Sequence, residues 1–373
     1  MYKICHVTNV HKPEDGRIFR RACVSSAKAG YDTYLVEMGN SYDKKGVHII
    51  GIGYPEKPGR LYRMTRFAKK AYRAALQVDA DLYHLHDPEL LRFASKFKRK
   101  GKKVVFDSHE NYFDMILRKS YLPLYKLIGK RIYSYIEKMY TIIDGVTYPA
   151  DDEYYQKIQR LCKTTCITGN YPWKSELYDK YITHIEKENR TACYIGSITR
   201  AHGVTEIIRA CYLAGFKLYL AGPFYTDDYK KSLFELPEFT CVEYLGVIGR
   251  EEVLAVLQKV EVGLCVLHNE GQFYTSRNLS TKVYECMAMG LPVILNNSTY
   301  NIELIEKYNF GICVNPSNLD EITNALLGLA NDKAFAKNLG KNGRQLLAES
   351  FCWDKEQINL LRMYDSILNS ELE

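Results

Sequence analysis

The chain has 373 residues, of which 46% are hydrophobic and 25% are charged, and its formal net charge is +7. This balance excludes an intrinsically disordered chain, and the length exceeds what one hydrophobic core usually organises, so we expect two domains. The sequence has no run of about eighteen apolar residues and its N-terminal segment resembles a strand rather than a signal peptide, so we expect a cytoplasmic protein.

Strand and helix patterns alternate through the first half of the chain. Helical segments such as 17–30 and 61–77 stand among short runs rich in β-branched and aromatic residues. These strand candidates are 3–10, 32–38, 47–53, 81–87, 102–108, 144–150 and 164–170. The alternation is typical of a parallel sheet that helices cover on both faces.

The pattern restarts after a polar stretch near residues 170–190. The second set of strand candidates is 191–197, 216–223, 240–247, 260–267, 291–296 and 312–316. We therefore predict an α/β chain with two doubly wound Rossmann-like domains that face each other across a cleft. Their predicted bounds are 1–170 and 171–353, and we expect a C-terminal helix, 354–373, to return to the first domain. In such folds ligands bind at the carboxyl ends of the strands.

Charge is divided unequally between the two halves. Residues 1–170 carry 31 lysines and arginines against 18 acidic residues, whereas the remainder carries 20 against 26. In 118–140 the cations mix with Tyr, Leu and Ile, as in helices that lie on membranes. An anionic membrane surface is therefore one expected partner, and a solvated or domain-packed helix face is the alternative. Nucleic acid is not expected, because no reader motif accompanies the charge.

The eleven cysteines are typical of reduced core thiols. Their number is odd, they form no C-x-x-C pair, and several lie in apolar runs such as VGLCVL. This distribution argues against a disulfide framework or a zinc site.

Two loops of the second half carry the residues of a candidate anion site. In SITRAHG, Arg200 and His202 precede Gly203 at a helix start, which offers a guanidinium and backbone amides to a phosphate. The second loop opens the segment NLSTKVYECMAMGLPVI, residues 278–294.

The start of this second segment combines an expected helix cap with two charges. Ser280 or Thr281 can cap the helix, Lys282 adds a positive charge, and Glu285 lies one turn further on the same face. A carboxylate in this position suits a pair of ribose hydroxyls, while the positive groups suit a diphosphate. The two loops therefore predict a nucleotide site.

The segment 282–293 resembles the K-x-x-E-x-M-A-x-G-x-P-V signature of retaining GT-B glycosyltransferases of family 4, also called glycosyl transferases group 1. Further stretches along nearly the whole chain are similar to this family, of the type found in polysaccharide biosynthesis. They are VTNVHKPEDGRIFRRACVSSAKAGY, LHDPELL, VVFDSHENY, GNYP, YIGSITRAHG, VEYLGVIGREEVLAVL and FCWDKEQINLLRMY.

The resemblance implies roles for individual residues. On the donor side, Glu285 binds ribose, Arg200 and Lys282 hold the diphosphate with His202 in the same loop, and the backbone around Val247 meets the base. His109 is the implied catalytic residue, placed against the donor sugar and the reaction centre. The residues implied for the acceptor side or the sugar are Asp15, Arg17, His86, Asp87 and Glu110.

Two positions depart from the family pattern. The family often carries a second acidic residue eight positions before the ribose glutamate, and this chain has Arg277 there. The usual lysine of the phosphate loop is replaced by His202, which leaves Arg200 and Lys282 to neutralise most of the diphosphate charge. Glu270 or Asn278 are the alternatives for contacting the donor sugar.

The resemblance implies a metal-independent transferase that needs no cofactor. It uses a UDP- or GDP-sugar as substrate and transfers the sugar, with retention, to a glycan or lipid-linked glycan in cell-surface polysaccharide biosynthesis. The expected location is cytoplasmic, including peripheral attachment to the inner face of the plasma membrane. Two alternatives stay open: a nucleotide-sugar 2-epimerase and a non-catalytic nucleotide-sugar-binding protein. The D-x-D triplet at 79–81 lies at the wrong end of its strand for a metal site in the cleft.

Overall fold

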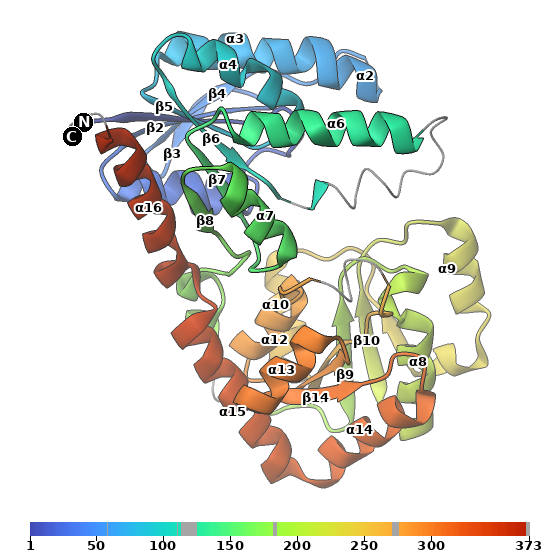
Figure 1. Cartoon of the computed structure of the whole chain (residues 1–373). Coiled ribbons are helices and arrows are strands. Elements are labelled where there is room, and N and C mark those ends of the chain that lie inside the picture. The colour runs from blue at the N-terminus through green and yellow to red at the C-terminus, as the bar shows by residue number, and fades with distance from the viewer. Residues whose placement is uncertain (58, 110, 113–124, 182–184, 271–275, 371–373) are drawn as a thin grey trace. The chain divides into compact units, whose positions relative to one another are not determined.

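The computed structural model describes residues 1–373 except 58, 110, 113–124, 182–184, 271–275 and 371–373 (Figure 1). The chain divides into two compact units. Unit 1 comprises Met1–Asn170 and Trp353–Glu373, and unit 2 comprises Tyr171–Cys352. The C-terminal helix, α16 (Trp353–Asn369), therefore packs with the N-terminal part of the chain.

Unit 1 is built on a sheet that, within the described residues, has eight strands in the order β3-β4-β2-β1-β5-β6-β7-β8. The strands are β1 (Lys3–Val7), β2 (Asp32–Glu37), β3 (Tyr42–Lys44), β4 (Val47–Gly51), β5 (Leu82–Leu85), β6 (Lys103–Asp107), β7 (Gly145–Tyr148) and β8 (Thr165–Ile167). All neighbours run parallel except β3, which pairs antiparallel with β4. The sequence pattern did not reveal β3, because its three residues, YDK, include no β-branched side chain.

Helices cover both faces of this sheet (Figure 1). They are α1 (Val24–Lys28), α2 (Arg60–Tyr62), α3 (Ala68–Val78), α4 (Ala94–Lys98), α6 (Tyr125–Tyr140), α7 (Glu153–Leu161) and α16. Helix α3 packs on β1 and β2 through a stripe of small buried residues at helical spacing, including Ala68, Ala71 and Ala75. Helix α16 packs on β7 and β8. A Cβ at Gly145 would lie 2.4 Å from the methyl group of Met363, so this glycine lets α16 approach closely.

Unit 2 is built on a second parallel sheet, with six strands among its described residues in the order β11-β10-β9-β12-β13-β14. The strands are β9 (Thr191–Ile195), β10 (Lys217–Ala221), β11 (Val242–Tyr244), β12 (Val262–Cys265), β13 (Val293–Asn296) and β14 (Gly311–Val314). The chain leaves β9 on one side toward β10 and later returns on the other side at β12. This reversal of strand order is where doubly wound sheets bind ligands.

The helices of unit 2 are α8 (Val204–Ala214), α9 (Asp227–Phe234), α10 (Arg250–Lys259), α12 (Thr281–Ala288), α13 (Thr299–Tyr308), α14 (Leu319–Asn331) and α15 (Lys333–Ser350). One hydrophobic cluster joins the sheet to α8 and α14, and a second joins it to α10, α12 and α15. The prediction of two doubly wound α/β domains is thus confirmed. Across the part of the chain that the structure describes, no helix combines the length and hydropathy that a membrane crossing requires.

Candidate active site

A cavity of about 360 Å³ opens in unit 2 at the carboxyl end of β9. It is lined by Ile195, Gly196, Ser197, His202, Arg250, Val253, Ser280, Thr281, Lys282 and Glu285. The cavity therefore lies where the strand order reverses, and it gathers residues from both loops that the sequence singled out.

Three helices begin beside this cavity. Residues that line it precede or open α8, α10 and α12, namely His202, Arg250 and Thr281. The free amides at a helix start and the helix dipole favour an anion. Ser280 occupies the N-cap of α12 in an extended conformation, but its side chain makes no capping hydrogen bond. Ser280 therefore does not cap the helix with its side chain, and Thr281, the alternative, is the first residue of α12.

Lys282 is held deep in the cavity wall. Its amine donates a hydrogen bond of 2.8 Å to Tyr194 Oη and lies 4.2 Å from the centre of that ring. A Cβ at Gly196 would come within 3.2 Å of the amine, so only glycine lets the amine sit against this turn without displacement. Burial lowers the pKa of Lys282. Among the described residues no ion pair to this amine is found, and a buried cation in such a setting attracts an anion.

Glu285 lines the same cavity and meets Arg250. The distance between Glu285 Oε1 and Arg250 Nη1 is 2.5 Å, and the exposed fractions of the two side chains are 15% and 42%. Lys282 and Glu285 thus share one face of α12, as their spacing predicts. Arg250 was not foreseen, because it reaches Glu285 from a different helix, 35 residues earlier in the chain.

His202 and Arg200 separate in the structure. His202 lines the cavity, with Nδ1 lying 2.5 Å from Thr199 Oγ1. Burial, together with the charge of Lys282, lowers the pKa of His202 to about 4, so its imidazole is neutral at neutral pH. Arg200 is exposed, lies outside the cavity lining, and rests 4.9 Å from the centre of the Tyr229 ring.

The remaining donor-side candidates lie away from the cavity lining. Val247 is 76% exposed on the segment between β11 and α10. Arg277, at the position where the family often has an acid, pairs with Glu303 at 2.8 Å. Asn278 accepts a hydrogen bond of 2.8 Å from Tyr284 Oη. Arg277 and Asn278 therefore contact other side chains of unit 2.

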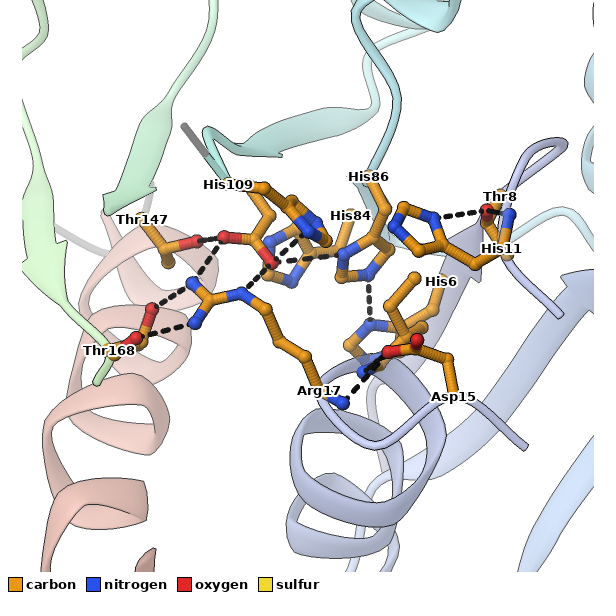
Figure 2. Close-up of polar contacts among 12 residues, drawn as sticks. His6, Thr8, His11, Asp15, Arg17, His84, His86, His109, Thr147 and Thr168 are labelled. Atoms are coloured by element: carbon orange, nitrogen blue, oxygen red, sulfur yellow. Dashed lines mark hydrogen bonds and ion pairs between the residues drawn. The ribbon is translucent and has the colours of Figure 1, made fainter. Parts of the chain in front are cut away.

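Unit 1 holds a second polar cluster, centred on the buried carboxylate of Asp107 at the end of β6 (Figure 2). Arg17 donates to both of its oxygens, at 2.8 and 2.6 Å, and Thr147 donates to Oδ1 at 2.8 Å. Burial alone would raise the pKa of Asp107, but Arg17 and His109 outweigh it and hold the pKa well below its usual range. Asp107 is therefore an ionised centre around which the other groups are arranged.

His109 lies at the more open side of this cluster. Its Nε2 is 3.0 Å from Asp107 Oδ2, and 17% of its side chain is exposed. The ionised carboxylate of Asp107 therefore lies directly beside the imidazole ring of His109.

His11 stacks on His109, with ring centres 4.8 Å apart, a contact that no sequence pattern indicated. His11 Nδ1 lies 3.2 Å from Asp87 Oδ1. Burial opposes protonation of His11, but the hydrogen bond and charge of Asp87 outweigh it and raise the pKa. Asp87 is itself buried and accepts from Thr8 Oγ1 at 2.8 Å. Two aspartate–histidine pairs therefore stand side by side in unit 1.

Figure 2 also shows the imidazole of His86 next to that of His6, and both side chains are buried. His86 Nδ1 is 3.2 Å from Asp107 Oδ2, and His86 Nε2 is 3.0 Å from His6 Nδ1. The carboxylate requires the proton of His86 on Nδ1, so His86 Nε2 accepts from His6. His84 Nδ1 lies 2.6 Å from Tyr364 Oη of α16. Both nitrogens of His86 are thus engaged, although His6, His84 and His86 lie close enough to share a cation.

Two of the acceptor-side candidates serve the local structure of unit 1. Only 10% of the Arg17 side chain is exposed, and it also donates to the backbone oxygen of Thr168 at 2.6 Å, so it ties the β6 and β8 ends together. Asp15 accepts the backbone amides of Arg17 and Ile18, at 2.8 and 3.0 Å. The implied acceptor-side role of Arg17 stays a prediction, and the contacts of its guanidinium found here are with Asp107, Thr168 and Asn170. Glu110 lies outside the described residues.

Most of unit 2 is similar to a known protein family. Residues 179–346 match the family model for glycosyl transferases group 1. An uncharacterized glycosyltransferase of Methanocaldococcus jannaschii is 22% identical over 202 residues, which are 52% of this chain and 50% of that protein. This chain spans about half the length, or less, of the curated relatives that it matches.

Solved structures resemble the chain over almost its full length. The sucrose-phosphate synthase of Thermosynechococcus elongatus has a TM-score of 0.77 at 14% identity, covering 99% of this chain and 100% of the other. HepE of Anabaena, solved in complex with UDP-glucose, has a TM-score of 0.68 at 14% identity, covering 98% and 100%. At this identity the likeness shows the fold alone. Residues 179–346, within unit 2, are thus similar to glycosyl transferases group 1, and the chain shares its two-domain fold with these solved structures.

Proposed function

We propose that the chain transfers a sugar from a UDP- or GDP-sugar to a glycan or lipid-linked glycan acceptor, with retention and without a metal ion. The observation that carries this proposal is the unit 2 cavity, where Lys282, Arg250 and Glu285 meet beside three helix starts. It offers positive charge for a diphosphate and a carboxylate for a ribose within one pocket, at the point where doubly wound sheets bind nucleotides.

The donor would be divided among these groups by charge. The diphosphate would meet Lys282 and the free amides at the start of α12, and the ribose hydroxyls would donate to Glu285. Support comes from the group 1 domain match over this region and from the fold likeness to HepE, which was solved with UDP-glucose. Arg200, exposed and outside the cavity lining, would contribute less than the sequence suggested.

The chemistry would follow from how charge develops during transfer. Breaking the bond between the anomeric carbon and the phosphate places positive charge on the sugar and negative charge on the departing nucleoside diphosphate. Groups already oriented toward that negative charge stabilise the transition state without reorganising. Retention rests on the family resemblance, with His109 orienting or polarising the reacting groups. An inverted product anomer, measured by NMR on a defined acceptor, would contradict this part of the proposal.

The acceptor side is proposed to lie in unit 1 and to work at the cytoplasmic face of a membrane. Helix α6 exposes the apolar residues Leu127, Ile132 and Tyr135 together with Lys130, Arg131 and Lys138. A helix that mixes exposed apolar and basic side chains suits an anionic lipid surface. A lipid-linked glycan at such a surface, in the assembly of a cell-surface polysaccharide, fits this charge.

A thermal-shift screen of the full chain against UDP, GDP and their sugar conjugates tests the proposal. A bound nucleotide raises the midpoint of unfolding, and at a fixed concentration a tighter ligand raises it further. We expect one of the two nucleotides to stabilise the chain, and Glu285→Gln to abolish most of the shift. No shift with any of these compounds would overturn the proposal.

Two incubations then separate the alternatives. Donor alone, followed by NMR, would reveal a 2-epimerase as interconversion of the sugar without an acceptor. The non-catalytic alternative is favoured by Arg277, which stands where the family often has a second acidic residue. Arg277 pairs with Glu303, so this position offers no carboxylate to the donor sugar. A non-catalytic protein would bind the nucleotide but leave the donor intact in the presence of membrane extracts that contain acceptors.

A further inference from the structure

The pairing of Arg250 with Glu285 is unusual for its local setting. Arg250 is the first residue of α10, where the helix dipole disfavours a cation. The turn itself is stabilised independently of Arg250, because Glu252 Oε2 accepts the backbone amide of Gly249 at 2.8 Å. Arg250 is therefore not needed to start the helix. A residue that breaks a local preference commonly does so for a functional reason.

The geometry of the pair leaves half of the carboxylate available. Arg250 contacts Oε1 of Glu285, and among the described residues no partner is found for Oε2. Both residues line the cavity. A carboxylate has about four acceptor sites on its two oxygens, so one guanidinium contact leaves room for two hydroxyl donors. The contact also fixes the orientation of a side chain that would otherwise rotate among several rotamers.

We propose that Arg250 is a positioning residue for ribose recognition. It holds Glu285 so that the free oxygen faces the cavity and can accept from the 2′- and 3′-hydroxyls of the nucleotide. This inference rests on the proposed function and adds a residue from a second helix to the ribose site. Arg250 acts through Glu285 and makes no contact of its own with the ribose.

Two other roles for Arg250 make different predictions. If the guanidinium bound the diphosphate directly, its loss would weaken every nucleoside diphosphate, whatever the sugar hydroxyls. If the ion pair instead blocked the ribose site, its loss would strengthen binding. A positioning role differs from both. The loss of Arg250 would then weaken only those ligands whose ribose hydroxyls donate to Glu285.

The test measures the affinity of the full chain for the nucleotide that binds in the thermal-shift screen, UDP or GDP, and for its 2′,3′-dideoxy form. Titration calorimetry would be performed on the wild type, Arg250→Gln, Arg250→Lys, Glu285→Gln and the double variant R250Q/E285Q. The control is Lys259→Gln, at the other end of α10, where Lys259 stacks on Tyr219 outside the cavity lining. Because Arg250 is 42% exposed, its substitution leaves the core of unit 2 intact.

We expect Arg250→Gln to weaken the natural nucleotide by about tenfold, as the loss of one orienting hydrogen bond to a charged group would. The same substitution should leave the affinity for the dideoxy form unchanged. Arg250→Lys should recover only part of the loss, because an ammonium lacks the planar fork of a guanidinium. The double variant should bind no more weakly than Glu285→Gln alone, since residues that act as a unit are not additive.

Three outcomes would overturn the inference: an equal loss for both ligands, a gain in affinity, or no change in Arg250→Gln. Failure of the proposed function looks different. In that case the wild type would bind neither UDP nor GDP, or Glu285→Gln would bind as the wild type does, and the inference would fall with it.

Discussion

At the scale of single residues, Lys282 shows how a helix start and a buried cation cooperate. Its amine lies against Tyr194 and the Gly196 turn, in a wall where burial lowers its pKa. A diphosphate would restore the environment that water supplies to an exposed lysine. The amine is thus oriented before the ligand arrives, which is the condition under which electrostatic groups contribute most to catalysis.

Replacing this amine should be costly. We expect Lys282→Met to lower kcat/KM for the sugar nucleotide by about two to three orders of magnitude, as the loss of one preorganised donor to a developing negative charge does. Lys259→Met is the matched control, because Lys259 also stacks on a tyrosine, Tyr219, but outside the cavity lining. Equal effects of the two substitutions would show that the cavity is not the donor site.

The buried histidines of unit 1 give a pH dependence of stability with a definite sign. Burial lowers the pKa of His86 to about 3 and the pKa values of His6 and His84 well below the usual range. In the unfolded chain these groups titrate near about 6.5. The folded state therefore binds fewer protons below that pH, and the free energy of unfolding falls as the pH falls. The depressed pKa of Asp107 adds a further loss only in more acidic solution.

Urea denaturation measured between about pH 4.5 and pH 7 checks this dependence. Each of the three histidines should contribute a slope of about 1.4 kcal/mol per pH unit below pH 6.5. His84→Gln should reduce the total slope by about 1.4 kcal/mol per pH unit, since one titrating group is removed. Stability that is flat over this interval would contradict the buried arrangement.

Some site residues could be predicted from the sequence and others could not. Lys282 and Glu285 were found together because helical spacing places them on one face. Arg250 and His11 escaped because their partners, Glu285 and Asp87, are 35 and 76 residues away in the chain. Only the fold brings these pairs together. One local signal could have pointed to Arg250. It stands at the start of a helix, where a cation is locally unfavourable.

At the scale of elements, α16 joins the C-terminus of the chain to the core of unit 1. Trp353 Nε1 donates to Ser25 Oγ at 2.8 Å, and the backbone amide of Gly169 donates to Glu356 Oε1 at 2.8 Å. Further along the helix, Tyr364 reaches the buried imidazole of His84. A helix was expected over 354–373, but its polar contacts with Ser25, Gly169 and His84 depend on the assembled unit.

Removing the hydroxyl of Tyr364 isolates one of these contacts. Tyr364→Phe keeps the buried ring but leaves His84 Nδ1 without its partner, so we expect the free energy of unfolding to fall by about 1–3 kcal/mol. Tyr225→Phe is the control, because Tyr225 is 71% exposed. Equilibrium urea unfolding measures both variants. A Tyr364→Phe variant as stable as the wild type would show that the hydrogen bond to His84 is not formed.

At the scale of the whole molecule, the unequal division of charge is the property that sequence alone captured fully. The count needs no structure, and Lys130, Arg131 and Lys138 of the basic half are indeed exposed on α6. The alternation of strands and helices likewise predicted both sheets. The antiparallel edge strand β3 was missed, because three residues carry too little pattern to be recognised.

Salt-dependent binding to lipid vesicles follows from this charge. We expect the chain to sediment with vesicles that contain phosphatidylglycerol and to be released from them by added salt. It should not bind vesicles of phosphatidylcholine alone. A triple substitution of Lys130, Arg131 and Lys138 by serine should lower the partition coefficient by about two orders of magnitude, at about 1 kcal/mol per cation. Lys230→Ser with Lys231→Ser, on α9, is the control. Binding that ignores both salt and lipid charge would remove the membrane proposal.

Hydrogen exchange of the full chain, with and without saturating UDP or GDP, tests the central claim most directly. If the nucleotide occupies the unit 2 cavity, slower exchange should appear at residues 195–202, 250–253 and 280–285, which contain its lining. Exchange should change little elsewhere in unit 2. A nucleotide that binds but leaves all three segments unprotected would contradict the assignment of this cavity as the donor site.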